Sequence, residues 1–97
     1  MKNSCINKNL DTLAEQVKVI GEPNRLKIIC LLKTGPKCVC EIFEFLKLPQ
    51  NLVSHHLKIL LDVAIVNNQR DGKKIVYSLN QKTMTTLLKE LKNILTI

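Results

Sequence analysis

The sequence predicts a mainly α-helical protein with one small β-hairpin. Apolar residues recur at helical spacing through most of the chain, which is the pattern of amphipathic and buried helices. A single Asp71-Gly72 pair separates two runs of β-prone residues, which is a strong hairpin signal. The 97 residues, 45% of them hydrophobic, are enough for one small core, so we expect residues 1–97 to form a single domain.

The chain is expected to open with two helices. Apolar residues every three or four positions from Leu10 to Ile20 predict an amphipathic helix that ends near Gly21. A second helix is predicted from Glu22-Pro23, because proline is favoured in the first helical turn. This helix is apolar on most sides, which predicts that it is buried, and Thr34-Gly35-Pro36 ends it.

Two further helices are expected on either side of a short turn. Residues 38–46 predict a short third helix, and Lys47-Leu48-Pro49 predicts the turn. A fourth helix, from about Gln50 to Asp62, has its apolar side chains on one face. The opposite face carries Asn51, Ser54, His55, Lys58 and Asp62. A short helix, a turn and a helix with a polar outer face are typical of a helix-turn-helix unit.

The predicted hairpin follows this unit directly. Residues 64–70 and 74–79 form its two strands, and the turn needs a positive φ that glycine adopts without steric cost. Arg70, Lys73 and Lys74 crowd its tip. A hairpin with a basic tip after a helix-turn-helix is a wing, so we assign residues 64–80 to a wing and the fold to the winged helix-turn-helix class.

The two ends of the chain are expected to differ. Residues 81–97 predict an amphipathic helix whose apolar face is too broad for so small a domain to cover. That face predicts a dimerisation helix and therefore a homodimer. Residues 1–8 are assigned to an N-terminal arm. The arm has no apolar signal-peptide core and the chain has no apolar stretch of membrane-spanning length, so we expect a cytoplasmic protein without a membrane partner.

The charge of the chain favours double-stranded DNA as a partner. Fifteen Lys and Arg against eight Asp and Glu give a net charge of +7, which attracts phosphates, although basic surfaces also serve solubility. Only three aromatic residues occur, which argues against recognition of single strands by stacking. The candidate DNA-binding residues are Gln50, Asn51, Ser54, His55, Lys58, Arg70, Lys73 and Lys74.

Cys38-Val39-Cys40 lies at the start of the predicted third helix. The helix dipole and the free backbone N–H groups there lower thiol pKa values, which makes thiolates available for metal or redox chemistry. Inert packing is the alternative, since cysteine is often a small buried hydrophobe. In a cytoplasmic protein the four cysteines are expected as thiols, and Cys30 is expected in the core. The Cys-x-x-Cys motif of thiol oxidoreductases is missing, so we do not expect an enzyme.

Four segments in order resemble the ArsR/SmtB family of winged-helix repressors: residues 21–28, 37–42, 53–60 and 70–79. The resemblance implies a homodimer that binds an inverted-repeat operator and leaves DNA when a metal or metalloid binds. At Cys38 and Cys40 it implies As(III)/Sb(III) or Cd(II)/Pb(II) as the effector, because soft thiolates suit these ions, and no organic cofactor. A repressor of the same fold that responds to thiol oxidation or persulfides is the alternative.

The resemblance leaves a third ligand to be found. In one arsenite-responsive subfamily it is a cysteine three residues after the second, but this chain has Phe43 there. Cadmium- and lead-type members take cysteines from an N-terminal arm, which makes Cys5 the candidate. The family's other metal site uses Asp, His and Glu on the terminal helix. Here that helix offers only Glu90, so we expect no such site.

Overall fold

The structure, a computed structural model, describes residues 9–96 and confirms a mainly helical fold with a small sheet. The elements are α1 (Asn9–Ile20), α2 (Pro23–Leu32), β1 (Lys37–Cys38), α3 (Val39–Leu46), α4 (Gln50–Asp62), β2 (Val66–Asp71), β3 (Lys74–Leu79) and α5 (Gln81–Leu95). Every helix predicted from the sequence is present in this range, with ends within about two residues of those expected. None of the described helices is long and apolar enough to cross a membrane.

The sheet is antiparallel with the order β1-β3-β2. β2 and β3 form the predicted hairpin, in which Asp71 pairs with Lys74. Gly72 takes a φ of +64° in the turn, as the prediction requires. The sequence analysis missed β1, in which Cys38 pairs with Val76 of β3. A strand of two residues is too short to show the alternation by which strands are found in a sequence.

The hydrophobic core joins α2, α3, α4 and the base of the sheet. Ile28, Ile42, Leu57, Leu60 and Ile65 are completely buried in it. Each of these side chains contributes roughly 1.5–3 kcal/mol by leaving water, so the core fixes the order in which the helices pack. The core therefore holds α4 against α2 and α3 and leaves its other face free.

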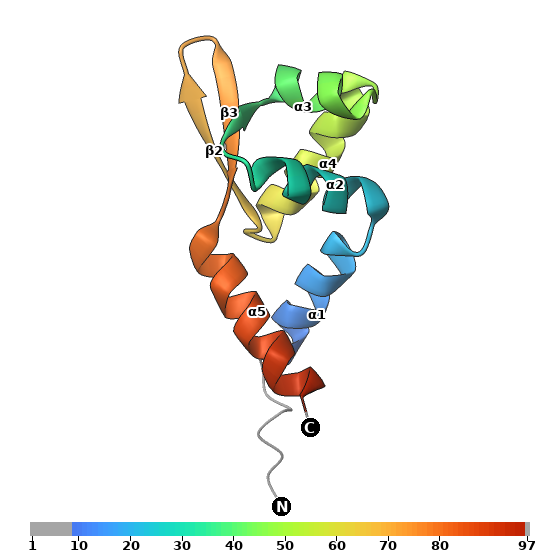
Figure 1. Ribbon diagram of the computed structural model, residues 1–97, viewed down its shortest axis with the longest axis vertical. Helices are drawn as coiled ribbons and strands as arrows, with labels where there is room; N and C mark the ends of the chain where they lie inside the picture. The colour runs from blue at the N-terminus through green and yellow to red at the C-terminus, as the bar shows by residue number, and fades with distance from the viewer. Residues whose placement is uncertain (1–8, 97) are drawn as a thin grey trace, which may run out of the picture.

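The two ends of the molecule have different characters (Figure 1). The β2–β3 hairpin projects at one end beside α3 and the start of α4, while α1 and α5 converge at the other. Leu87 of α5 is buried, whereas Leu88 and Leu95 are 69% and 75% exposed. The broad apolar face predicted for the terminal helix is thus only partly covered.

One expectation for α2 is wrong. The helix was expected to be buried on most sides, but Leu26 is 46% exposed and the Cys30 side chain lies at the surface instead of in the core. Helix α2 packs against α1, α3, α4 and β3, and the remaining side faces solvent. Ile28, Ile29 and Leu32 fill the inner side, so Cys30 has no place there.

Candidate functional site

The outer face of α4 is polar and free. Its apolar residues Val53, Leu57 and Leu60 are completely buried, so the helix is anchored along one side. The predicted contact residues Gln50, Asn51, Ser54, His55 and Lys58 are all exposed on the remaining surface. These side chains offer the amide, hydroxyl, imidazole and ammonium groups that read base edges and phosphates.

A tight turn sets the direction of α4. Helix α3 ends at Leu46, the next residue Lys47 takes the left-handed conformation with a φ of 55°, and the Leu48 N–H donates to the Phe43 carbonyl. Pro49 then precedes α4 and accepts from the N–H groups of Leu52 and Val53. The left-handed residue ends α3 and reverses the chain, so that α4 leaves α3 at an angle.

A buried histidine ties α4 to α2. The Arg25 Nε–H donates to His56 Nδ1 at 3.2 Å, and the Glu22 carboxylate lies 3.6 Å from the same nitrogen. Arg25 also donates from Nη1 to the Val19 carbonyl at 3.2 Å. Burial lowers the pKa of His56, and Arg25 acts in the same direction while Glu22 opposes it. His56 is thus a buried, hydrogen-bonded histidine whose surroundings favour the neutral imidazole.

The wing presents positive charge at its tip. Arg70, Lys73 and Lys74 are exposed at the end of the hairpin, in the position predicted for them. Among residues 9–96 no ion pair joins a carboxylate to any of these three cations, and Asp71 lies opposite Lys74 in the hairpin. The three cations are available for phosphates.

Cys38 caps the start of α3. Its Sγ accepts from the Glu41 N–H at 3.4 Å, and the Glu41 carboxylate accepts from the Cys38 N–H at 3.1 Å, which together form a capping box. Cys38 is 4% exposed, while the side chain of Cys40 is exposed. The pair therefore combines a buried structural sulfur with one that reagents can reach.

The structure joins Cys38 and Cys40 in a disulfide, so the expectation that both are thiols is wrong for this state. A Cys-x-Cys disulfide needs a bend in the backbone, and the bend is present because β1 ends at Cys38 and α3 begins at Val39. The two Cα atoms are 5.4 Å apart, which lies in the usual range for a disulfide.

A pocket of about 390 Å³ brings the predicted sites together. We call it the sulfur pocket. It is lined by Cys38, Val39, Cys40, Gln50, Ser54, Lys73, Lys74, Ile75 and Tyr77. Two elements predicted to contact DNA, the start of α4 and the wing, thus form its sides together with the sulfur pair. The sequence analysis predicted these residues separately but missed that they share one pocket, because β1 creates the proximity.

The other cysteines lie elsewhere. Cys5 falls outside the described residues. Cys30 lines a separate groove between α2 and α3 with Leu26 and Phe45. Between residues 9 and 96 no three His, Cys, Asp or Glu side chains are grouped closely enough to hold a metal ion. The described part of the chain thus offers the sulfur pair alone.

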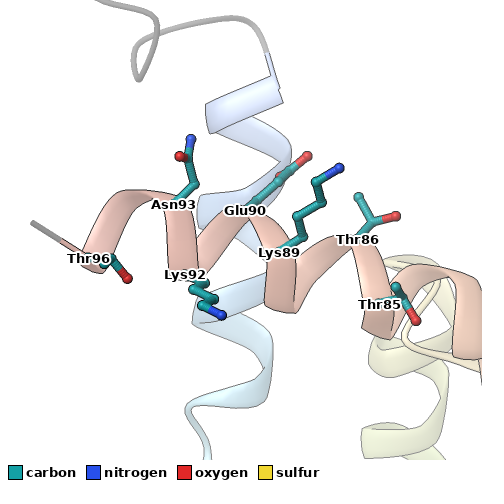
Figure 2. Close-up of a pocket in the computed structure, with 7 residues that line it drawn as sticks. All are labelled: Thr85, Thr86, Lys89, Glu90, Lys92, Asn93 and Thr96. Atoms are coloured by element: carbon teal, nitrogen blue, oxygen red, sulfur yellow. The ribbon is translucent and has the colours of Figure 1, made fainter.

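A hollow of about 900 Å³ lies along helix α5, and its lining does not resemble a metal site. It is lined by Thr85, Thr86, Lys89, Glu90, Lys92, Asn93 and Thr96. Figure 2 shows that these side chains, from α5 and from Thr96 directly after it, point to both sides of the helix instead of converging. Glu90 is the single carboxylate among them.

Comparison with known sequences gives a consistent family assignment. Residues 22–68 match the model of the bacterial regulatory protein, arsR family. An arsenical resistance operon repressor of Staphylococcus xylosus is 37% identical over 77% of this chain and 69% of its own length. The protein of the same name from Staphylococcus aureus is 34% identical over 87% of this chain and 78% of its own length.

Solved structures show the same fold. The transcriptional repressor BigR from Xylella fastidiosa is 27% identical, with a TM-score of 0.74 over 100% of this chain and 99% of its own. HlyU from Vibrio cholerae is 24% identical and superposes with a TM-score of 0.78 over 95% of this chain and 100% of its own. The winged helix-turn-helix arrangement of the described elements is the one these proteins share.

Proposed function

Because this chain belongs to the ArsR family of bacterial regulatory proteins, we propose that it is a homodimeric, cytoplasmic repressor that leaves its operator when the sulfur pair binds a soft metal or metalloid ion. The observation that carries this proposal is the sulfur pocket. It places Cys38 and Cys40 against Gln50 and Ser54 of α4, so the sensing groups adjoin the groups that would read DNA.

The DNA-binding part of the proposal rests on two exposed polar surfaces. Helix α4 would enter the major groove with Gln50, Asn51, Ser54 and His55 towards base edges and Lys58 towards a phosphate. The wing would place Arg70, Lys73 and Lys74 on the neighbouring backbone. A homodimer of such units matches an inverted-repeat operator, because the symmetry of the protein repeats in the site.

The chemistry of the sulfur pair supports a soft ion as the effector. Thiolates prefer soft ions, so reduced Cys38 and Cys40 fit As(III)/Sb(III) or Cd(II)/Pb(II) better than hard cations. The two staphylococcal relatives are named for arsenical resistance, which favours As(III). We propose Cys5, from the arm of residues 1–8, as the third sulfur ligand.

The capping box offers a route from the sulfur pair to DNA. Cys38 Sγ serves the Glu41 N–H in the cap, and ligation would compete for the same sulfur. Weakening the cap alters the first turn of α3, and α3 packs directly against α4. A change of orientation of α4 that weakens operator binding by about 1–3 kcal/mol is a normal size for such coupling.

Release of DNA by defined ions tests the proposal. A duplex selected from a random pool by the reduced protein would be titrated with As(III), Sb(III), Cd(II) and Pb(II), with binding followed by fluorescence anisotropy. We expect release by at least one ion, and no release from a Cys38→Ser/Cys40→Ser double variant that still binds the duplex. Cys30→Ser is the matched control and should respond as the unaltered protein. A double variant that still responds to every ion would refute the site.

The disulfide favours one second function, a repressor that senses oxidation. Closing the disulfide removes two electrons and two protons from the Cys38 and Cys40 thiols, and hydrogen peroxide accepts them to give two molecules of water. Adding hydrogen peroxide, or a persulfide donor, to the reduced complex separates the two functions. Release by either reagent, reversed by dithiothreitol, with no release by the four ions would favour the thiol-responsive repressor.

A further inference from the structure

We propose that operator DNA closes the sulfur pocket, so that the effector captures only repressor that has already left DNA. The inference rests on the proposed function and specifies how its sensing site is regulated. In this scheme the duplex and the effector exclude each other at one place on the surface, in addition to any change of shape transmitted through α3.

The lining of the sulfur pocket comes from both elements that are predicted to contact DNA. Its lining combines Gln50 and Ser54 of α4, Lys73 and Lys74 at the wing and the sulfur pair. Figure 1 shows the hairpin and α3 side by side at the same end of the molecule, and β1 joins them through its pairing with β3. The pocket thus shares its lining with both elements that are predicted to contact DNA.

The two cysteines of the pocket differ in their exposure to solvent. Cys38 is 4% exposed and the Cys40 side chain is open to solvent, so a reagent that reaches the pair meets Cys40 in the sulfur pocket first. A duplex held by Gln50 and Ser54 at its base edges and by Lys73 and Lys74 at its phosphates spans the pocket from side to side. Its backbone then covers the approach to Cys40.

Cys30 provides an internal comparison. It is also exposed, but it lines the groove with Leu26 and Phe45 and shares no residue with the sulfur pocket. Neither side of its groove includes a residue predicted to contact DNA. Duplex DNA should therefore protect Cys40 from chemical attack and leave Cys30 reactive in the same molecule.

Alkylation of the reduced protein measures this protection. Iodoacetamide would be added to a Cys5→Ser variant with and without the selected duplex, and labelling of each cysteine followed by peptide mass spectrometry. With free duplex at about 100 times its Kd, about 1% of the protein stays unbound, so the rate at Cys40 should fall about 100-fold and the rate at Cys30 by less than about twofold. Equal labelling of Cys40 with and without duplex would overturn the inference.

The kinetics of release give an independent test. Arsenite would be mixed rapidly with the complex of the reduced protein and a fluorescently labelled duplex. The rate at which the duplex is released would be compared with the rate of spontaneous dissociation, measured by adding excess unlabelled duplex. We expect the two rates to agree and to stay constant as arsenite increases. A release rate that rises in proportion to arsenite would show attack on the bound complex and would refute the proposal.

The outcomes separate this inference from the function on which it rests. Release by arsenite without protection of Cys40 would overturn the inference and leave the proposed repressor intact. Protection of Cys40 without release by any of the four ions would support closure of the pocket and refute the effector assignment. A protein that selects no duplex would refute both.

Discussion

At the scale of single residues, Cys38 has two tasks that compete. Its sulfur caps α3 through the Glu41 N–H, and the same sulfur belongs to the pair proposed to bind the effector. Its near-complete burial suits the first task, whereas the exposure of Cys40 suits the first encounter with a reagent. Under the proposed function, the two cysteines would thus serve different roles.

His56 predicts a dependence of stability on pH. Its pKa in the folded protein lies below the ordinary value of 6.5, so the unfolded chain binds the proton more readily. Stability is therefore complete above about pH 7 and falls as the pH drops through about 6.5 towards the pKa of the folded state. Urea unfolding between about pH 7.5 and pH 5 measures this fall.

His56→Gln is the matched variant, because glutamine can accept from Arg25 but does not titrate in this range. The variant should lose less stability over the same pH interval than the unaltered protein, since the contribution of the imidazole is removed. Identical pH profiles for the two proteins would show that His56 does not titrate between the folded and unfolded states.

At the scale of elements, the start of α3 depends on its cap. Glu41→Ala removes the carboxylate that accepts from the Cys38 N–H, and we expect a loss of about 1 kcal/mol in the free energy of unfolding. Glu41→Gln, whose amide oxygen can still accept, should lose clearly less. Denaturant unfolding compares the three proteins, and equal losses in both variants would contradict a role for the hydrogen bond.

The turn of the hairpin depends on Gly72. A Cβ at this position would meet nothing within 4 Å, so the cost of Gly72→Ala comes from the backbone alone, at a φ of +64°. We expect about 1–2 kcal/mol of destabilisation, measured by thermal unfolding. Gly72→Asn should lose less, since asparagine tolerates the left-handed conformation. An alanine variant as stable as the original would show that the turn relaxes.

Most elements could be predicted because their signals are local. Helical spacing identified α1 to α5, and the Asp71-Gly72 pair identified the hairpin. Strand β1 could not be found, since two residues show no periodicity and its pairing with Tyr77 and Val76 is distant in sequence. The residues of the candidate site could be named from the sequence because their signals are local. Their assembly around one pocket could not be predicted, because it depends on the pairing of β1 with β3, which is distant in sequence.

The misplacement of Cys30 has a different cause. Its neighbours Ile29 and Leu31 made the local sequence apolar on both sides, and burial is the common state of cysteine. Which side of a short helix faces the core is decided by the elements that pack on it, and a helix that is apolar all round contains no signal for this. Tertiary packing therefore determined that Cys30 faces solvent, which the local sequence pattern could not predict.

At the scale of the whole molecule, the exposed apolar surface of α5 predicts the oligomeric state. Leu88 and Leu95 lie two turns apart on the same face and are mostly exposed. Leu88→Asp should raise the dimer dissociation constant at least about tenfold, because it removes apolar burial and adds a charge. Sedimentation velocity at several concentrations measures the change.

Lys58→Glu is the control for this prediction. It also introduces a carboxylate at an exposed helical position, but on the outer face of α4. We expect it to leave the dimer unchanged and to weaken DNA binding, with a smaller dependence of affinity on salt. If Leu88→Asp sediments as the unaltered protein does, the dimer uses another surface.

Strand β3 links the sulfur pair to α5. Its middle pairs with β1 beside the sulfur pair, through Val76 and Cys38, and its C-terminal end leads into α5 after a single residue, Asn80. A hydrogen-bonded strand is stiff along its length, so a tilt imposed at β1 reaches α5 with little loss. In a dimer joined through α5, a small local rotation would change the distance between the two copies of α4, which has to match half-sites spaced by one helical turn of DNA or a multiple of it.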